Sequence, residues 1–312
     1  MSCALRVPAA FARCIRDSFG ADGQVWLQGL AALLADLAAE WELSIGAPFE
    51  LSYNYVVAAK QRDGTPAVLK IGVPRAEIRR EQSALSLYAG DGACRVIRSD
   101  FERCAMLLER VEPGEMLVRL VRADDEQATR IGARLLRKLW RPVPAEACPT
   151  LRPVSEWFAA FDRHRQAYDG PGPLPRRVFD AGVAAATTLL DSAPAPVLLH
   201  GDFHHYNVLS ARREDWLAID PKGMTGDRGY DVGPFMCNPR PSDGPLSPAM
   251  LQRRLDILAE ELEYDRARLR DWSIAHAVLS ACWSAEDHST GWQAAVNVAE
   301  MLLASSSPRS RP

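Results

Sequence analysis

The sequence has 312 residues, of which 47% are hydrophobic and 25% are charged, and its formal net charge of −3 excludes the basic face expected of a nucleic-acid-binding protein. Its length suits two compact globular lobes, and no stretch reaches the ~18 uncharged apolar residues of a membrane span, so no membrane partner is expected. Seven cysteines without a Cys-x-x-Cys pair argue against a disulfide framework and favour a cytoplasmic protein.

Residues 1–112 predict a lobe that mixes helix and sheet. Apolar residues recur every three or four positions from Trp26 to Trp41, which is typical of an amphipathic helix. The segments that follow have the turn residues and alternation of a β-hairpin, then of a helix and more sheet. We expect strands at 49–59, 67–71, 95–97 and 106–108, and a helix at 77–88.

Residues 113–304 predict a second lobe that is mainly helical, with one β-rich segment in its middle. Helices are expected at 124–140, 154–168, 177–191, 248–260, 265–285 and 292–304, and strands at 197–200 and 216–220. Residues 305–312 are polar and contain proline, so a disordered tail is expected there. The predicted fold class is therefore α+β with two lobes.

The stretch that begins at His200 has the residue order of a phosphoryl-transfer loop. Asp202 follows His200 by two positions and Asn207 follows Asp202 by five, which are the offsets of a kinase catalytic loop. Phosphoryl transfer needs a carboxylate that orients the acceptor hydroxyl and oxygen ligands that hold magnesium on the phosphates. Asp202 suits the first task. Asn207 suits the second, together with Asp220, which ends a predicted strand.

A single lysine interrupts an apolar strand in the first lobe. The ammonium of Lys70 must either reach solvent or meet an anion, and contact with the α- and β-phosphates of a nucleotide explains its position. In the next helix Glu81 lies in the middle of the inward stripe. We expect Glu81 to pair with Lys70 and orient it, as a glutamate does in protein kinases. Glu77, one turn earlier, is the competing candidate.

Several motifs together resemble the aminoglycoside/hydroxyurea antibiotic resistance kinase family, and the resemblance is to its streptomycin 6-kinase-like members. They lie at 64–70, 107–114, 200–209, 216–223 and 226–232. The resemblance covers residues 20–304 and implies a protein-kinase-like bilobal fold with ATP in the cleft and Mg²⁺ as cofactor. It also implies a monomer or weak homodimer that phosphorylates a hydroxyl of a small polar or cationic molecule.

The resemblance assigns further residues. The adenine is expected to contact the backbone near Glu109 and Val111. Asp231 is expected to be a buried anchor for the catalytic loop, with His200 as a second structural support, and neither takes part in the chemistry.

The sequence departs from the kinase pattern at the turn that would cover the phosphates. This turn, at 51–55, contains no glycine, so close approach of backbone to phosphate is harder. Ser52 and Asn54 are expected to donate hydrogen bonds instead. Lys222, beside Asp220, is either a further phosphate contact or an ordinary surface lysine. The missing glycines also keep open a nucleotide-binding pseudokinase without activity.

For the acceptor, we expect a streptomycin-like aminocyclitol, with hydroxyurea as the alternative. A cationic acceptor needs carboxylates and an aromatic face, which Glu286, Asp287 and Trp283 offer near the end of a predicted helix. A different class, a zinc-dependent hydrolase, would instead use the cluster His200, Asp202, His204 and His205.

Overall fold

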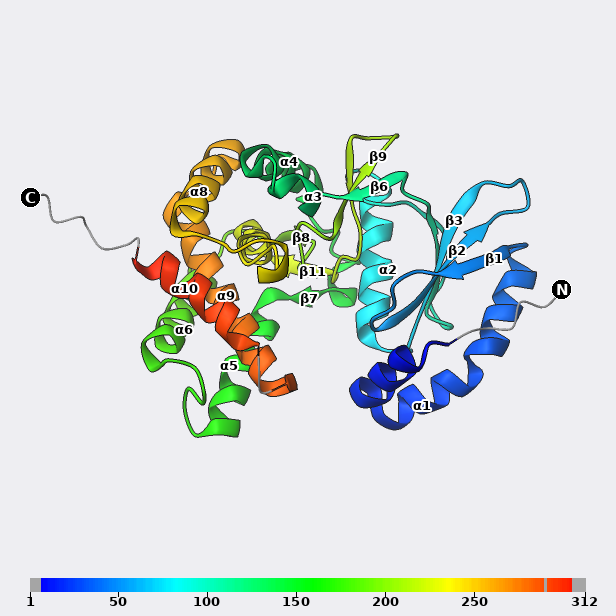
Figure 1. The fold of residues 1–312 in the computed structure, drawn as a ribbon, viewed down its shortest axis with the longest axis horizontal. Helices are drawn as coiled ribbons and strands as arrows, with labels where there is room; N and C mark the ends of the chain where they lie inside the picture. Colours follow the sequence, from blue (N-terminus) through cyan, green and yellow to red (C-terminus); the bar gives the residue numbers. More distant parts are fainter. Residues whose placement is uncertain (1–6, 289–290, 305–312) are drawn as a thin grey trace, which may run out of the picture. The chain divides into compact units, whose positions relative to one another are not determined.

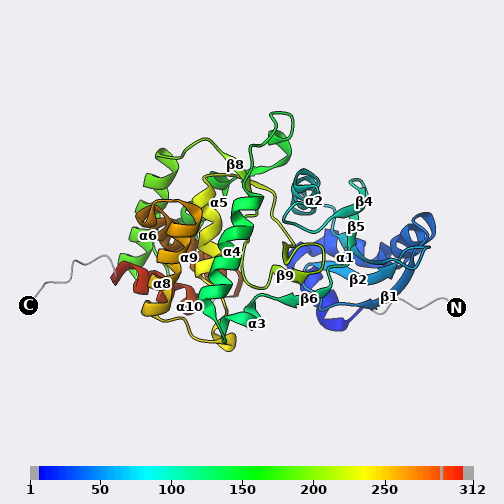
Figure 2. The same ribbon diagram turned by 90° about the horizontal axis from the view of Figure 1, so that it is seen from above.

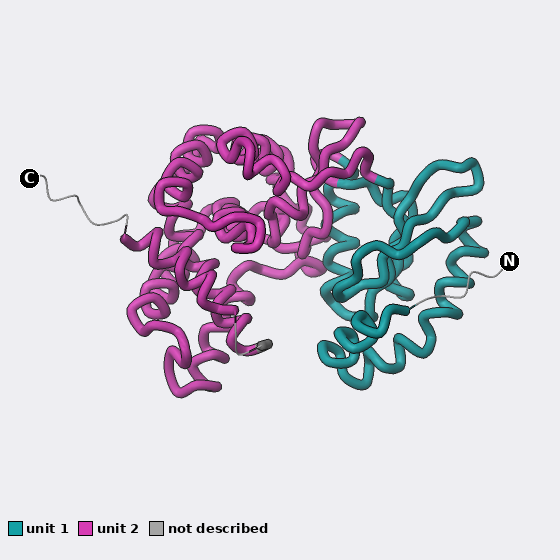
Figure 3. The backbone as a smooth tube through the Cα atoms, in the orientation of Figure 1, with its two compact units in different colours: residues 1–90, 94–110 teal, residues 91–93, 111–312 magenta. Residues whose placement is uncertain are grey.

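Figure 1 shows the protein as a computed structural model. The structure describes residues 7–288 and 291–304, except for the side chains of residues 287 and 288. It divides into two compact units, residues 1–90 with 94–110 and residues 91–93 with 111–312 (Figure 3). The tail expected at 305–312 lies outside the described residues. Within the described ranges, no helix is both long and apolar enough to cross a membrane.

The first unit contains a five-stranded antiparallel sheet in the order β1-β2-β3-β5-β4. Its elements are α1 (Ala9–Glu40), β1 (Ser44–Pro48), β2 (Asn54–Lys60), β3 (Pro66–Gly72), α2 (Ala76–Tyr88), β4 (Val96–Asp100) and β5 (Ala105–Glu109) (Figures 1 and 2). The predicted hairpin is confirmed, because β2 and β3 pair along their whole length. The helix predicted at 77–88 is also confirmed, as α2.

The strand predicted at 49–59 begins later than expected, at Asn54. A separate strand, β1, precedes it and ends at Pro48, where the sequence indicates a break. Proline removes a backbone donor, but β1 is the edge strand of the sheet and its register with β2 shifts just before Pro48. An edge strand and a register shift both tolerate a missing N–H, so a strand can include Pro48. The prediction that Pro48 separates the strands from what precedes them was therefore wrong.

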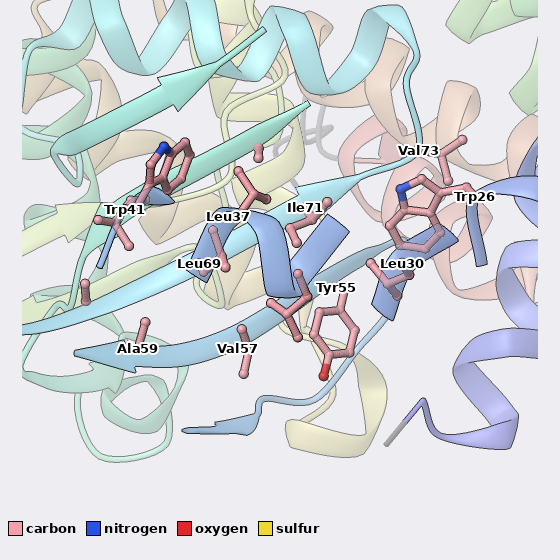
Figure 4. Packing of buried hydrophobic residues seen from close by; sticks show 14 of the residues in the cluster. Trp26, Leu30, Leu37, Trp41, Tyr55, Val57, Ala59, Leu69, Ile71 and Val73 are labelled. Atoms are coloured by element: carbon pink, nitrogen blue, oxygen red, sulfur yellow. The ribbon is translucent and has the colours of Figure 1, made fainter. Parts of the chain in front are cut away.

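One face of this sheet is covered by α1. Figure 4 shows its apolar side chains packed against those of β2 and β3, and the labelled residues are Trp26, Leu30, Leu37, Trp41, Tyr55, Val57, Ala59, Leu69, Ile71 and Val73. The helix predicted from Trp26 is confirmed, but it also extends back to Ala9 through a kink at Gly20, where φ is +56°. Burial of each large side chain contributes roughly 1.5–3 kcal/mol, so α1 is a major stabilising element.

The second unit is mainly helical, and within the described residues α9 packs against α5, α6, α7, α8 and α10. Figure 2 labels all of these helices except α7. Its helices are α3 (Val118–Val121), α4 (Asp125–Leu139), α5 (Val154–Tyr168), α6 (Arg176–Asp191), α7 (Val232–Met236), α8 (Pro248–Leu262), α9 (Arg266–His288) and α10 (Trp292–Ala304). The predicted helices at 154–168 and 292–304 are confirmed at both ends. The other four long helices are confirmed with small differences at their ends, whereas the short α3 and α7 were not predicted.

Short strands in this unit position the residues of interest. They are β6 (Pro113–Met116), β7 (Arg152–Pro153), β8 (Val197–Leu199), β9 (Val208–Ala211), β10 (Trp216–Ala218) and β11 (Met224–Gly226). They form two three-stranded sheets, β10-β9-β6 and β7-β11-β8. The predicted loop therefore joins β8 of one sheet to β9 of the other, and β10 leads directly to Asp220.

Candidate active site

The loop after β8 is fixed at its start by a buried carboxylate. Asp231 accepts hydrogen bonds from the backbone N–H groups of His200 (3.0 Å) and Gly201 (2.7 Å) and from the indole N–H of Trp140 (3.1 Å). Burial raises the pKa of Asp231 to about 6, and the three donors oppose this effect. These contacts are those expected of an anchor, because they hold two successive residues of the loop.

His200 ties the loop to the segment that follows β10. Its Nδ1 accepts a hydrogen bond from the backbone N–H of Asp202 (3.3 Å), so the ring proton lies on Nε2, which donates to the carbonyl oxygen of Ile219 (2.9 Å). Burial lowers the pKa of His200 to about 4, and the ring is therefore neutral at pH 7. With both nitrogens engaged, His200 is placed to support the loop.

Asp202 is a half-buried carboxylate with a cation beside it. Its Oδ1 lies 3.5 Å from Nε2 of His204, and its Oδ2 lies 3.3 Å from Nζ of Lys222. Burial alone would raise the pKa of Asp202, but the Lys222 ammonium and the neighbouring histidines lower it to about 2. Asp202 is thus an anion at neutral pH, able to accept a hydrogen bond from a hydroxyl group.

Asn207 and Asp220 are brought together by backbone contacts. The Asn207 Nδ2 donates to the carbonyl oxygen of Asp202 (3.0 Å), and the Ile219 N–H donates to the carbonyl oxygen of Asn207 (2.9 Å). The Asn207 Oδ1 accepts no hydrogen bond from the part of the chain that the structure describes. Asp220 has a φ of +58°, an uncommon conformation for a residue other than glycine. An amide oxygen and a carboxylate are ligands that magnesium prefers, so these residues fit that ion.

The histidines around Asp202 do not form a zinc site. His205 is fully buried and stacks on Phe235 with 3.9 Å between ring centroids, while both nitrogens of His200 are engaged by backbone. Among residues 7–288 and 291–304, no three His, Cys, Asp or Glu side chains are grouped to hold a metal ion. The arrangement therefore does not support the zinc-hydrolase alternative.

In the first unit, Lys70 and Glu81 form the expected ion pair. Nζ of Lys70 lies 2.7 Å from Oε1 of Glu81, and the two residues are only 2% and 6% exposed. Lys70 alternates with core residues of β3, so it points to the face of the sheet opposite α1. The competing Glu77 is exposed to solvent. Glu81 is thus the partner of Lys70, and the prediction is confirmed.

The other residues predicted to contact the nucleotide lie in loops and at strand ends. Ser52 is exposed in the turn between β1 and β2, and Asn54 begins β2 with its Oδ1 beside Gly72, where an added Cβ would lie 2.6 Å away. Glu109 ends β5 and accepts a hydrogen bond from the Arg95 N–H (2.8 Å). Val111 is the buried residue that follows Arg110. Their proposed roles rest on position alone.

Trp283 belongs to an aromatic cluster that the sequence does not reveal. Its ring meets the ring of Trp157 on α5 edge to face at 4.9 Å and that of His276 at 6.3 Å, and both tryptophans are half-buried. The Tyr230 hydroxyl forms a hydrogen bond with Nδ1 of His276 (3.2 Å). Burial lowers the pKa of His276 to about 4 against the opposing charge of Asp202. The cluster thus extends from α5 to within electrostatic reach of Asp202.

Sequence reasoning missed Trp157, His276 and Tyr230. Trp157 occupies an ordinary position in an amphipathic helix, and only tertiary packing brings it to Trp283.

Of the two carboxylates predicted beside Trp283, the structure describes the side chain of one only. Glu286 lies 3.8 Å from the guanidinium of Arg163, which partly neutralises its charge. The side chain of Asp287 lies outside the described residues. Their role in binding an acceptor stays a prediction.

Solved structures define the class of fold. The chain superposes with a TM-score of 0.62 on a thermostable mutant of aminoglycoside phosphotransferase APH(4)-Ia, solved as a ternary complex with ADP and hygromycin B. The match covers 88% of this chain and 98% of the other at 14% identity. At that identity the similarity shows the fold alone. The predicted α+β, protein-kinase-like fold is confirmed.

Sequence comparison then gives the family. The profile of the aminoglycoside/hydroxyurea antibiotic resistance kinases matches residues 44–288. Streptomycin 6-kinase of Streptomyces griseus is 35% identical over 92% of this chain and 93% of that protein. Hydroxyurea phosphotransferase of Kitasatospora aureofaciens is 31% identical over 96% of this chain and 86% of that protein. The chain belongs to the aminoglycoside/hydroxyurea antibiotic resistance kinase family and is a phosphotransferase.

Proposed function

We propose that this protein uses ATP and magnesium to phosphorylate a hydroxyl group of a streptomycin-like aminocyclitol. The observation that carries the proposal is the loop from His200 to Asn207. There the Asn207 Nδ2 donates to the main-chain carbonyl oxygen of Asp202, which carries an ionised carboxylate, and the buried Asp231 holds the preceding Gly201 N–H. The Asn207 Oδ1 accepts no hydrogen bond from the described residues. The similarity to a streptomycin 6-kinase supports the choice of acceptor.

Asp202 is the proposed catalytic base. The acceptor hydroxyl donates a hydrogen bond to its carboxylate, which aims the oxygen at the γ-phosphorus. A P–O bond forms to the acceptor while the bond from that phosphorus to the β–γ bridging oxygen breaks, and ADP leaves with that oxygen. The hydroxyl proton passes to Asp202.

The remaining polar residues are proposed to hold the nucleotide. Lys70, oriented by Glu81, contacts the α- and β-phosphates, while Asn207 and Asp220 hold magnesium. The ion, when bound, neutralises negative charge that develops on the phosphate oxygens. Glu109 and Val111 are proposed to contact the adenine, and Ser52 and Asn54 to donate hydrogen bonds to phosphate. Because ATP is abundant in the cytoplasm, we place the enzyme there.

The acceptor is proposed to bind on the side of Asp202 where α9 ends. Guanidinium groups stack on aromatic faces and pair with carboxylates through two parallel hydrogen bonds. Trp283 offers the aromatic face, and Glu286 and Asp287 offer the negative charge. Streptomycin carries such guanidinium groups, whereas hydroxyurea is small and uncharged and would leave these side chains unused.

A panel of acceptors tests the proposal. Purified protein with magnesium–ATP is incubated with streptomycin, other aminocyclitols and hydroxyurea, and phosphorylated products are identified by mass spectrometry. We expect transfer to streptomycin, with Asp202→Asn lowering kcat by about 10²–10³ while nucleotide binding persists. Asp180→Asn, an exposed carboxylate on α6, is the control and should keep full activity.

The same panel discriminates the alternatives. Phosphorylation of hydroxyurea and of no aminocyclitol would identify a hydroxyurea phosphotransferase, an activity that the name of one relative supports. Nucleotide binding without transfer to any acceptor would identify a pseudokinase, which the glycine-free turn at 51–55 keeps open.

A further inference from the structure

Each carboxylate oxygen of Asp202 has a neighbouring side chain, although the side chain of Asp202 is still 31% exposed. The His204 ring faces Oδ1, with 3.5 Å between Nε2 and the oxygen, and the Lys222 ammonium faces Oδ2 at 3.3 Å. A base must approach the hydroxyl proton to hydrogen-bond distance, about 2.6–3.2 Å between heavy atoms. The Lys222 ammonium therefore competes with an acceptor hydroxyl for Oδ2, and its charge lowers the pKa of Asp202, so Asp202 becomes a stronger base when Lys222 moves away.

Lys222 is the neighbour that can move. Its backbone is fixed, because its N–H donates to the carbonyl oxygen of His200 (2.7 Å), and an added Cβ at Gly201 would lie 3.1 Å from its own Cβ. Its side chain, however, is 42% exposed and is carried on a flexible four-carbon stem, whereas the side chain of His204 is 18% exposed. The ammonium can thus swing while its attachment to the loop stays in place.

We propose that Lys222 is a catalytic residue that leaves Asp202 for the γ-phosphate when ATP binds, which frees Asp202 Oδ2 for the acceptor hydroxyl. This inference rests on the proposed function and adds a residue and an order of events to it. The γ-phosphate carries more negative charge than one carboxylate, so it competes successfully for the ammonium.

The proposed movement couples two requirements of the reaction. At the γ-phosphate, Lys222 offsets charge on the transferring oxygens while the P–O bond to the acceptor forms and the bond to ADP breaks. At the same time Asp202 becomes more basic toward the hydroxyl proton. Without ATP the ammonium stays beside Oδ2, and Asp202 holds an acceptor hydroxyl less tightly. ATP is therefore expected to strengthen acceptor binding, and ADP, which lacks the γ-phosphate, is not.

Nucleotide binding provides a test that does not depend on the identity of the acceptor. Affinities for magnesium complexes of ADP and of a non-hydrolysable ATP analogue are measured by calorimetry for wild type, Lys222→Gln and Lys222→Arg. We expect Lys222→Gln to weaken binding of the analogue about tenfold or more, the scale of a lost charge-assisted hydrogen bond. ADP affinity should change less than about twofold, and Lys222→Arg should restore part of the loss.

A matched control is Lys138→Gln. Lys138 lies in the same unit, is 46% exposed and pairs with Glu214 at 2.7 Å and with Asp91 at 3.3 Å. Its removal therefore changes the net charge and breaks two ion pairs outside the loop. This variant should bind both nucleotides as wild type does. Circular dichroism and thermal unfolding verify that each variant is folded.

Activity measurements complete the test. With an acceptor from the panel, Lys222→Gln should lower kcat by about 10²–10³, as loss of one transition-state donor does. If Lys222→Gln binds the ATP analogue and ADP in the wild-type ratio and keeps its kcat, Lys222 is only a surface partner of Asp202 and the inference is wrong. If wild-type protein binds neither nucleotide, the proposed function fails instead, so the two failures are distinguishable.

Discussion

The carboxylate of Asp231 and the backbone N–H of Gly201 lie 2.7 Å apart, although 30 positions separate the two residues in the sequence. Gly201 has a φ of +82°, and an added Cβ would lie 2.5 Å from the sulfur of Met224. The loop before Asp202 is therefore held by a buried acceptor on one side and by close packing on the other. The position of the Asp202 carboxylate therefore depends on Asp231 and Met224, which lie more than 20 positions further along the chain.

Replacing this acceptor should loosen the loop. Asp231→Asn keeps the size of the side chain but leaves one oxygen to accept from the three N–H groups, so at least one buried donor loses its partner. We expect the free energy of unfolding, measured in urea, to fall by about 1–3 kcal/mol. The kcat should fall about tenfold or more because Asp202 is displaced. A variant that is destabilised but keeps the wild-type kcat would contradict the anchoring role.

The site shows which relationships are readable from sequence. The spacing of His200, Asp202 and Asn207 is local, and it predicted residues that the structure does place together. The partner of Lys70 was readable because Glu81 occupies the inward stripe of the next helix. By contrast, neither Trp140 nor Trp157 gave a signal, since Trp140 directly follows α4 and Trp157 lies at an ordinary helical position. Each acquires its role through contacts with residues far along the chain.

The fold shows the same limit. Long amphipathic helices such as α5 and α10 were predicted at both ends because their apolar residues repeat with the helical period over many turns. The strand β7 has only two residues and exists because it pairs with β11 from another part of the chain. No local pattern encodes so short a strand. Prediction therefore fails where tertiary pairing, and not periodicity, defines the element.

The magnesium dependence of activity tests whether Asn207 and Asp220 hold the ion. If both hold the ion, Asn207→Ala and Asp220→Ala remove one oxygen ligand each, and the magnesium concentration for half-maximal activity should rise about tenfold or more. Titration of magnesium at fixed ATP measures this. Asn207→Asp retains an oxygen ligand and should show a smaller increase. An unchanged magnesium requirement in Asp220→Ala would refute its assignment.

His205 should make the stability depend on pH. It is fully buried, and neither ring nitrogen has a hydrogen-bond partner among the residues that the structure describes. Burial lowers the pKa of His205 well below its ordinary value of 6.5. The unfolded chain therefore binds a proton more readily than the folded one below pH 6.5, and stability falls as the pH decreases there, by at most about 1.4 kcal/mol per pH unit for this residue.

His205→Phe isolates this contribution. Phenylalanine cannot be protonated and keeps the stacking on Phe235, so the variant should lose less stability than wild type between pH 6.5 and 4.5. The opposite effect of Asp231, whose pKa is raised to about 6, is present in both proteins and cancels in the comparison. The control is His164→Phe, which removes a hydrogen bond between His164 Nε2 and the carbonyl oxygen of Pro171 (3.0 Å) and should destabilise the protein at neutral pH. Parallel pH curves for wild type and His205→Phe would contradict the prediction.

Substitutions in the aromatic cluster beside His276 test whether the acceptor is cationic. The edge-to-face contact between Trp157 and Trp283 leaves these half-buried rings with surface that a guanidinium group can stack on. Stacking of this kind contributes about 0.5–2 kcal/mol, so Trp283→Leu and Trp157→Leu should each raise the KM for streptomycin roughly two- to thirtyfold with little effect on the KM for ATP. Glu286→Gln should raise the KM for streptomycin several-fold, since a charged partner is lost.

The matched control is Trp292→Leu. Trp292 is a half-buried tryptophan of α10 with no ring contact to this cluster within the described part of the chain. Quenching of tryptophan fluorescence by streptomycin, present in wild type and Trp292→Leu but reduced in Trp283→Leu, would locate the acceptor directly. Equal KM values for streptomycin in all four variants would place it elsewhere on the protein.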